Sequence, residues 1–203
     1  PRPPRPHRLL RRRRRANART QGFSSCVFAY GQTGSGKTYS MTGTPTDLGL
    51  APRAVADLFR QLAALEAGDE RLAGSVTVSY TEIYNEGLTD LLGDPAAPRA
   101  LEIRESALEG VHVKGLREVR VASPAQVAEV RALGDAARRT ACHRLNAASS
   151  RSHTIFTLRL KVFLRDGTAA DAAGAGAAAD ARACTNGRLH LVDLAGSERL
   201  SKT

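Results

Sequence analysis

The residue types with the clearest chemistry in this sequence stand together in residues 31–38, which read Gly-Gln-Thr-Gly-Ser-Gly-Lys-Thr and fit the pattern G-x-x-x-x-G-K-[ST]. Glycine lets the backbone curl with its amides pointing inward, where they can bind the α- and β-phosphates of a nucleotide. Lys37 would reach the β- and γ-phosphate oxygens, and the Thr38 hydroxyl would bind Mg²⁺. The candidate phosphate-binding residues are Gly31, Gln32, Thr33, Gly34, Ser35, Gly36, Lys37 and Thr38.

The flanking residues supply the elements that such a loop needs. Residues 26–30 (Cys-Val-Phe-Ala-Tyr) form a short apolar run that is typical of a buried parallel strand. A helix is expected directly after the loop, with its positive N-terminal end turned toward the anion. Strand, glycine-rich loop and helix in this order are the context of the phosphate loop in P-loop NTPases. We favour this interpretation over a Gly/Ser turn that precedes Lys-Thr by chance.

An NTPase also needs an acidic group near the metal and loops that sense the γ-phosphate. Asp193 follows the apolar run 189–192, where such an acid belongs, and the amide of Gly196 could approach the γ-phosphate. Residues 146–153 (Asn-Ala-Ala-Ser-Ser-Arg-Ser-His) are rich in hydroxyl groups and precede another predicted strand. Either segment alone could be a surface turn, but their order after the phosphate loop favours a nucleotide site.

Taken together, these motifs resemble the kinesin motor domain. The residues that carry the resemblance are the phosphate loop with Phe28-Ala29-Tyr30 before it, the switch I motif at 146–153 and the switch II motif Asp193-Leu-Ala-Gly-Ser-Glu198. Glu82-Ile-Tyr-Asn-Glu86 and Val111-His-Val-Lys-Gly-Leu116 also look like the family. The resemblance runs from about Gly22 to Thr203, apart from an Ala/Gly-rich insertion.

The resemblance implies roles for the nucleotide and the metal. ATP would be the nucleotide, with its phosphates on the loop and its adenine stacked on Tyr39. Mg²⁺ would be bound by Thr38 and Ser150, with Asp193 acting through a water molecule.

The resemblance also implies a catalytic set. Ser149 and Ser150 would place the attacking water, while Lys37 would stabilise developing charge. Arg151 and Glu198 would form an ion pair between switch I and switch II, and Gly196 would report the γ-phosphate through its amide.

The fold that follows is an α/β P-loop NTPase with a central, mostly parallel or mixed β-sheet and helices on both faces. Helical spacing predicts a helix from Pro52 to Gly68. A Ser-Pro-x-Gln start predicts another from Ser123 that continues, broken or unbroken at Gly134, to about Cys142. Residues 166–187 are expected to be a flexible insertion. Strands are predicted at 75–84, 101–103, 111–113, 119–121, 154–164 and 189–192.

The net charge of +10 belongs almost wholly to the N-terminal residues 1–19. They contain nine Arg and no acid, which leaves 21 Lys and Arg against 20 Asp and Glu in the remainder. The segment is predicted to be a disordered tail. An electrostatic arm for nucleic acid, an anionic membrane or another acidic polymer is an alternative to a solvated tail. Because the segment has no aromatic residue to stack on bases, we do not expect nucleic acid as a partner.

The remaining features concern location and partners. No apolar run approaches the ~18–20 residues that cross a bilayer. Three scattered cysteines indicate reduced thiols in an intracellular protein, without metal-binding spacing. The resemblance implies microtubules as the partner and a location in the cytoplasm, on the cytoskeleton. The sequence does not encode an oligomeric state.

The resemblance covers only part of a kinesin motor. Residues 20–203 are therefore expected to be an incomplete kinesin motor core, truncated at both ends and lacking most of the microtubule-binding helices. The first functional hypothesis is an ATP-hydrolysing microtubule motor domain. The alternative is a non-motile module that binds nucleotide and tubulin or another partner without productive hydrolysis.

Overall fold

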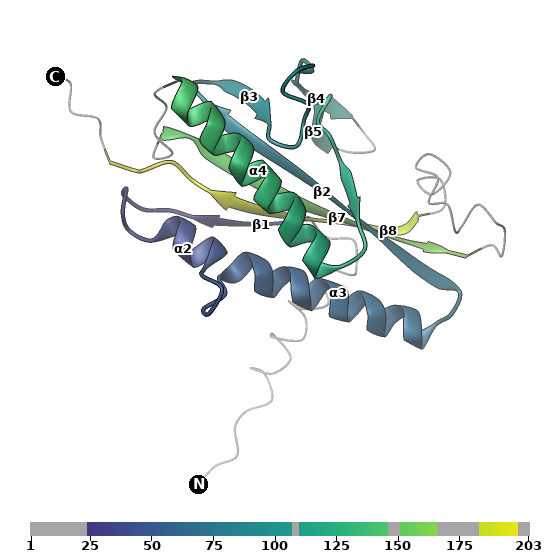
Figure 1. Ribbon diagram of the computed structural model, residues 1–203. Helices are drawn as coiled ribbons and strands as arrows, with labels where there is room; N and C mark the ends of the chain where they lie inside the picture. The colour runs from purple at the N-terminus through teal and green to yellow at the C-terminus, as the bar shows by residue number, and fades with distance from the viewer. Residues whose placement is uncertain (1–23, 107–109, 146–150, 166–182, 199–203) are drawn as a thin grey trace, which may run out of the picture.

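The computed structural model describes residues 24–106, 110–145, 151–165 and 183–198, which form a mixed sheet and three helices (Figure 1). The strand order is β1-β8-β7-β2-β3, and β6 also pairs with β2; β4 and β5 form a separate hairpin. The elements are β1 (Ser24–Ala29), α2 (Lys37–Thr42), α3 (Leu50–Gly68), β2 (Leu72–Tyr84), β3 (Gly87–Asp90), β4 (Glu102–Ser106), β5 (Gly110–Lys114), β6 (Val119–Val121), α4 (Pro124–Leu145), β7 (His153–Leu164) and β8 (Ala183–Asp193).

The prediction of a mixed sheet is confirmed, but most of the paired strands are antiparallel. Among the described strands only β1 and β8 pair in parallel, whereas β8 with β7 and β7 with β2 are antiparallel. The parallel pair is the one that positions the site. It brings Ala29, at the end of β1, opposite Asp193, at the end of β8.

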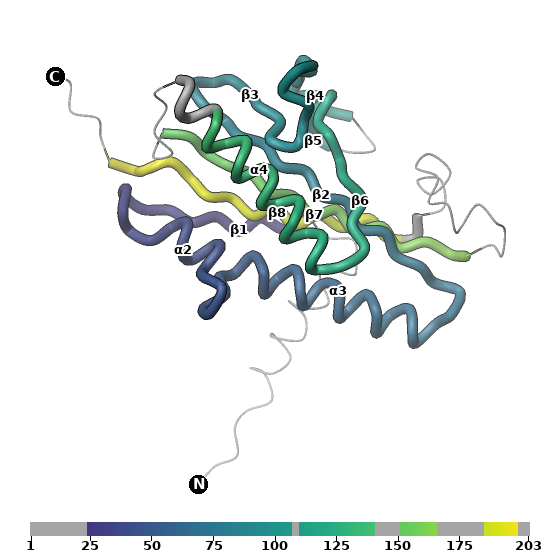
Figure 2. The backbone as a smooth tube through the Cα atoms, in the orientation of Figure 1, coloured from purple at the N-terminus to yellow at the C-terminus, as the bar shows by residue number. Residues whose placement is uncertain are grey.

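The helices α2, α3 and α4 lie on the same side of the sheet (Figures 1 and 2). Their apolar side chains pack against alternate residues of the central strands, including Val78, Leu158 and Leu191. This one-sided burial explains the period-two pattern that predicted β2 and β7. Among the described residues, the expected helices on both faces are therefore found on one face only.

The opposite sheet face is more polar and lies partly under the β4–β5 hairpin. A pocket of about 450 Å³ separates the hairpin from sheet residues that include Thr77, Ser79 and His190. Burial lowers the pKa of His190, whose Nδ1 lies 2.9 Å from the Thr157 hydroxyl. None of the described helices has the length and apolar character that a membrane span requires.

Two strand predictions need correction. β1 was expected to be buried on both faces, yet it is an edge strand of the described sheet, and Phe28 is 63% exposed. The predicted insertion 166–187 also extends too far, because residues 183–187 belong to β8 and pair with β7. The edge of β7 binds residues 183–187 through backbone hydrogen bonds. Such bonds do not depend on apolar side chains, which were the basis of the strand prediction. Residues 166–182, like the predicted tail 1–19, lie outside the described residues.

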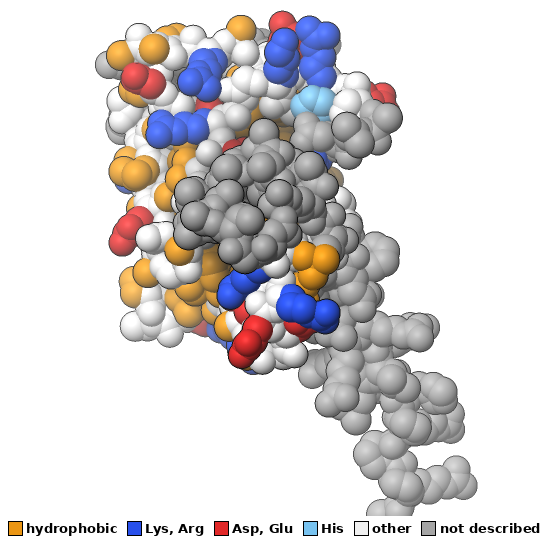
Figure 3. All heavy atoms as spheres, turned by 90° about the vertical axis from the view of Figure 1, so that its right-hand side faces the viewer, with side chains coloured by type: hydrophobic (Ala, Val, Ile, Leu, Met, Phe, Trp, Pro, Cys, Tyr) orange, Lys and Arg blue, Asp and Glu red, His pale blue; other side chains and the backbone are white. Residues whose placement is uncertain are grey.

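The face of the folded part that Figure 3 shows carries both basic and acidic side chains among its uncharged residues. This agrees with the near balance of charge that the sequence has after residue 19.

Candidate functional site

The glycine-rich stretch connects β1 to α2 and adopts the curled backbone that its sequence predicts. Gly34 and Gly36 have φ angles of 78° and 87°, a region that residues with a side chain rarely occupy. A turn closes within the loop, where the Ser35 amide donates to the Gln32 carbonyl at 3.2 Å. The loop residues Gln32 to Ser35 are exposed, so a ligand in solution can reach them.

Lys37 bends back over this loop. Its Nζ donates to the carbonyl oxygens of Gly31 at 2.8 Å and Gln32 at 2.9 Å. The ammonium group therefore lies at the loop itself, where the sequence predicts the phosphates. Carbonyl dipoles are weaker partners for an ammonium group than phosphate oxygens, so a nucleotide would offer Lys37 a stronger interaction.

Thr38 and Asp193 meet at the ends of α2 and β8. The Thr38 hydroxyl donates to Asp193 Oδ2 at 2.6 Å, whereas Asp193 Oδ1 is buried and has no hydrogen-bond partner among the described residues. A buried carboxylate oxygen without a partner is energetically costly and calls for a ligand. A hydroxyl and a carboxylate are the oxygen ligands that Mg²⁺ takes, directly or through water, so these residues fit the metal that the sequence implies.

The segment after β8 returns to the loop. The Ser197 amide donates to the Gly31 carbonyl at 3.1 Å, and Glu198 accepts hydrogen bonds from the Thr33 amide at 2.9 Å and from the Thr33 hydroxyl. A side chain at Gly196 would collide with the Glu198 carboxylate and the Thr33 hydroxyl. The two segments are thus in direct contact, and the space beside Gly196 leaves no room for a side chain.

The Glu198 carboxylate takes the place of an external anion on the loop amide of Thr33. Its pKa is lowered, first by the hydrogen bond from the Thr33 hydroxyl, then by backbone hydrogen bonds, and also by the charge of Lys37. The loop therefore already favours negative charge at this point. A phosphate that used the same amide would have to displace Glu198.

The predicted ion pair between Arg151 and Glu198 is absent from the described residues. Arg151 is exposed, and Glu198 contacts Thr33 instead. Two donors on one loop residue, the amide and the hydroxyl of Thr33, occupy the Glu198 carboxylate. Ser149 and Ser150 lie outside the described residues, so their predicted roles stay predictions.

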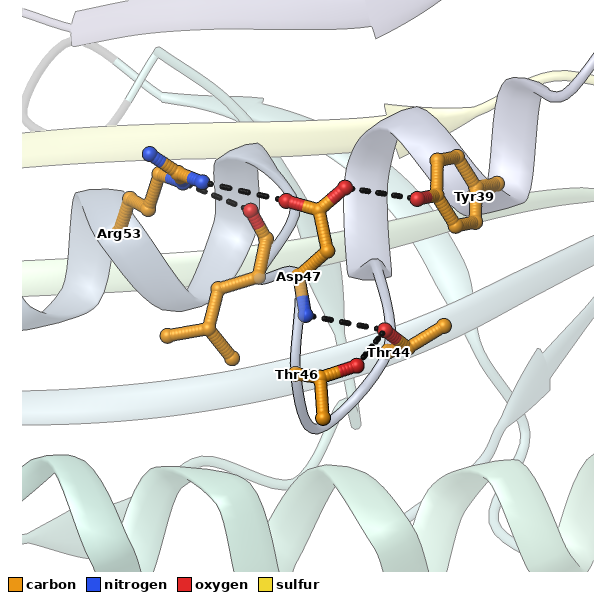
Figure 4. A network of polar contacts seen from close by, with 6 residues as sticks. Tyr39, Thr44, Thr46, Asp47 and Arg53 are labelled. Atoms are coloured by element: carbon orange, nitrogen blue, oxygen red, sulfur yellow. Dashed lines mark hydrogen bonds and ion pairs between the residues drawn. The ribbon is translucent and has the colours of Figure 1, made fainter.

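Tyr39 is half exposed on α2, one residue after the metal-binding candidate Thr38. Its hydroxyl donates to Asp47 Oδ2 at 2.7 Å, and Asp47 Oδ1 lies 3.5 Å from Arg53 (Figure 4). The hydrogen bond to Asp47 raises the pKa of Tyr39. Asp47 therefore restrains the ring that the sequence analysis placed against adenine, a contact that the sequence did not predict.

A second polar cluster lies beside this site, and its role did not emerge from the sequence. Arg138 Nε donates to Glu82 Oε1 at 3.0 Å, and another nitrogen of the same guanidinium donates to Ser152 Oγ at 2.9 Å. One sequence signal could have revealed it. Glu82 continues the buried alternation of Val76, Val78 and Tyr80, and a charged residue on an apolar face requires a partner.

Comparisons with known proteins agree with this geometry. The family described as kinesin motor domain matches residues 13–203, starting within the segment that was predicted to be a tail. The chain is 41% identical over 186 residues to kinesin-like protein Klp98A of Drosophila melanogaster and 40% identical over 185 residues to kinesin-like protein KIF13B of Homo sapiens. A solved structure described as a fast kinesin is 37% identical, with a TM-score of 0.77.

These matches cover most of this chain but only part of the relatives. About 90% of the chain aligns with Klp98A and KIF13B, yet it spans 13% and 9% of their lengths. For the solved fast kinesin, the match covers 94% of this chain and 50% of the other.

Proposed function

Because the chain belongs to the kinesin motor domain family, we propose that it forms the nucleotide-binding part of an ATP-driven microtubule motor. One observation carries this proposal beyond family membership. Thr38 and Asp193, 155 residues apart in sequence, meet at 2.6 Å beside the glycine-rich loop. Within the described part of the chain, the other, buried oxygen of Asp193 has no hydrogen-bond partner. That arrangement suits the Mg²⁺ ion that accompanies ATP.

The chain's own residues would bind the triphosphate by charge and by backbone amides. Lys37 would exchange its two carbonyl partners for phosphate oxygens, and the amides of residues 32–38 would donate to the α- and β-phosphates. When bound, Mg²⁺ would neutralise part of the charge on the β- and γ-phosphates. Thr38 and Asp193 would hold it, together with Ser150.

Hydrolysis would require a rearrangement of Glu198. Its carboxylate uses the Thr33 amide, which a phosphate also needs, and two anions would repel one another at that position. Release of Glu198 would free it for Arg151, the partner that the sequence analysis assigned. Ser149 and Ser150 would place the attacking water, while the Gly196 amide would contact the γ-phosphate.

The remaining proposed contacts are those with the adenine base and with the protein partner. Tyr39 would present its ring to adenine, restrained by the hydrogen bond from its hydroxyl to Asp47. Microtubules would be the partner, since the solved relative is described with "interactions with microtubules". The protein would accordingly work in the cytoplasm, on the cytoskeleton.

The proposal is tested by measuring Mg·ATP binding and hydrolysis by the chain, with and without microtubules. Thr38→Asn should weaken binding of Mg·ATP by about tenfold or more, because it removes an oxygen ligand and a charge-assisted hydrogen bond. Ser40→Ala is the matched control, because Ser40 is exposed on the same helix. Equal affinities in both variants would contradict the assignment of Thr38.

The second candidate is a non-motile module that binds nucleotide and tubulin or another partner without productive hydrolysis. The contact between Glu198 and Thr33 favours it, because Glu198 is then not available to Arg151. The same assay separates the two. Microtubule-stimulated phosphate release supports a motor, whereas nucleotide binding without turnover supports the binding module.

A further inference from the structure

Helix α4 presents three charged residues along one face, and each contacts a different part of the fold. Arg131, Asp135 and Arg138 are spaced i, i+4 and i+7, which places them on the same side of the helix. Arg131 donates to the Thr42 hydroxyl at 2.6 Å at the end of α2, and Asp135 accepts from the Tyr80 hydroxyl at 2.7 Å. The face therefore connects α4 to the helix of the phosphate loop and to β2.

Arg138 connects α4 to β2 and to the residue directly before β7. Its guanidinium donates through Nε to Glu82 on β2 and through a second nitrogen to Ser152, directly before β7. The Arg138 and Glu82 side chains are 14% and 7% exposed, and Ser152 is 2% exposed. A planar guanidinium can hold two partners in fixed directions, whereas a lysine ammonium at the same place would hold them less rigidly.

The contact continues from Ser152 to the segment that carries the acidic residues. His153, the next residue, accepts a hydrogen bond at Nδ1 from the amide of Ala195 at 3.1 Å. Ala195 stands two residues after Asp193 and immediately before Gly196. A connected path of contacts thus runs from Glu82 through Arg138, Ser152 and His153 to the chain that approaches the phosphate loop.

We propose that Arg138 is a positioning residue that fixes the segment 193–198 against the phosphate loop, acting through Ser152 and His153. The proposal deepens the proposed function, because this segment holds Asp193 against Thr38 and Glu198 against Thr33. Burial makes the Arg138 contacts costly to rearrange, so the start of β7 is held in one place. The Ala195 amide then has a fixed acceptor, and the metal-binding oxygen of Asp193 keeps its position.

Two variants break the path at different points. Ser152→Ala removes the acceptor hydroxyl and leaves the Arg138–Glu82 ion pair in place. Arg138→Lys keeps the charge but loses the two-partner geometry. Arg139→Lys is the matched control, since Arg139 is the exposed neighbour on the same helix. Amide hydrogen exchange on the full chain, without nucleotide, gives the first readout.

The expected result is local. Both variants should raise exchange in residues 193–198 by about tenfold, while residues 76–82 of β2 keep the wild-type rate, because only the positioned segment gains freedom. The Arg139→Lys variant should match the wild type throughout. Unchanged exchange in residues 193–198, or an equal increase across the sheet, would overturn the proposal, the latter because it would indicate a general loss of stability.

A nucleotide measurement separates this inference from the proposed function. Affinity for ADP and for Mg·ADP is measured for the wild type and the variants by displacement of a fluorescent ADP analogue. We expect Mg²⁺ to strengthen the binding of ADP to the wild type. In each variant this strengthening by Mg²⁺ should be about tenfold smaller, while the affinity for metal-free ADP should stay within about twofold of the wild-type value. A wild type that binds no nucleotide would refute the proposed function, whereas a full Mg²⁺ gain in both variants would refute the role of Arg138.

Discussion

The phosphate loop and the charged face of α4 use similar side chains for opposite purposes. Each combines a cation, a carboxylate and a hydroxyl: Lys37, Asp193 and Thr38 in one, and Arg138, Glu82 and Ser152 in the other. At the loop, Lys37 takes backbone carbonyls as partners, and one oxygen of Asp193 has no partner among the described residues. In the other set, Arg138 of α4, whose side chain is only 14% exposed, is paired with the buried Glu82 of β2.

The difference teaches how a ligand site can be told from an internal support. Polar atoms of a support are satisfied within the fold, while those of a site are left for something else to satisfy. Arg131 is a partial exception on the α4 face, because its Nε is buried without a hydrogen bond. Its guanidinium lies over the ring of Phe156, 5.6 Å from the centroid, and 4.0 Å from Asp135, which supplies compensating interactions.

The largest effect on stability is expected when one charged residue is removed from each of the two regions and the results are compared. Glu82→Ala leaves the buried Arg138 charge without its carboxylate and should reduce the free energy of unfolding by about 3–5 kcal/mol. Lys37→Met removes a partly exposed ammonium group and should change the free energy of unfolding by less than about 1 kcal/mol. Urea unfolding followed by circular dichroism measures both. A larger loss for Lys37→Met than for Glu82→Ala would break the comparison.

A second contrast concerns glycine in helices. Gly134 lies inside α4, where a Cβ would collide with the ring of Tyr80, while a Cβ at Gly68 on α3 would meet open space. Gly134→Ala should therefore destabilise the fold by about 1–3 kcal/mol despite its better helix propensity. Gly68→Ala should be neutral or stabilise the fold by up to about 1 kcal/mol. Thermal melts of the two variants test the difference, and a stabilising Gly134→Ala would contradict the packing of α4 on β2.

Tyr80 provides a test of burial by pH. Burial, reinforced by Asp135, raises its pKa from 10.0 to about 12. Because the folded state holds this proton more tightly, the stabilisation is complete below pH 10 and is lost as the pH rises through about 12, with about 2 kcal/mol of it gone by pH 12. Wild type should lose this much more stability than Tyr80→Phe between pH 9 and 12. Parallel losses in the two proteins would show that Tyr80 is not protected.

The smallest expected effect concerns Glu198 at the loop. The hydrogen bond from Thr33 lowers its pKa, so its contact should persist below the pH at which an ordinary glutamate is protonated, and it should be lost as the pH falls through the lowered value. The Thr33 amide resonance, followed by NMR during an acid titration, reports this event. Glu198→Gln is the control, in which the titration should disappear. A midpoint in the usual glutamate range would contradict the contact.

The sequence predicted the parts of the molecule that local chemistry determines. The loop follows from its glycines and Lys37, and the start of α4 follows from Ser123, whose hydroxyl accepts from the Gln126 amide at 3.2 Å. The sequence left open whether α4 breaks at Gly134. The helix runs through it without a break, and a glycine stands there because the ring of Tyr80, far away in sequence, leaves no room for a Cβ.

The buried support of the site is equally non-local. Arg138 meets Glu82 across 56 residues and Ser152 across 14, and no spacing rule connects them. The register of β8 from residue 183 likewise depends on β7 rather than on its own composition. The sequence therefore predicted the glycine-rich loop and its neighbouring strands better than the side chains that support them.

The central claim is that Lys37, Thr38 and Asp193 form a site for Mg·ATP, and the most direct test is calorimetric titration of ATP into the chain. With Mg²⁺ present, the account predicts binding that EDTA weakens and that Lys37→Met reduces by about tenfold or more, since a charge-assisted contact is lost. Binding that is insensitive to both EDTA and Lys37→Met would contradict it.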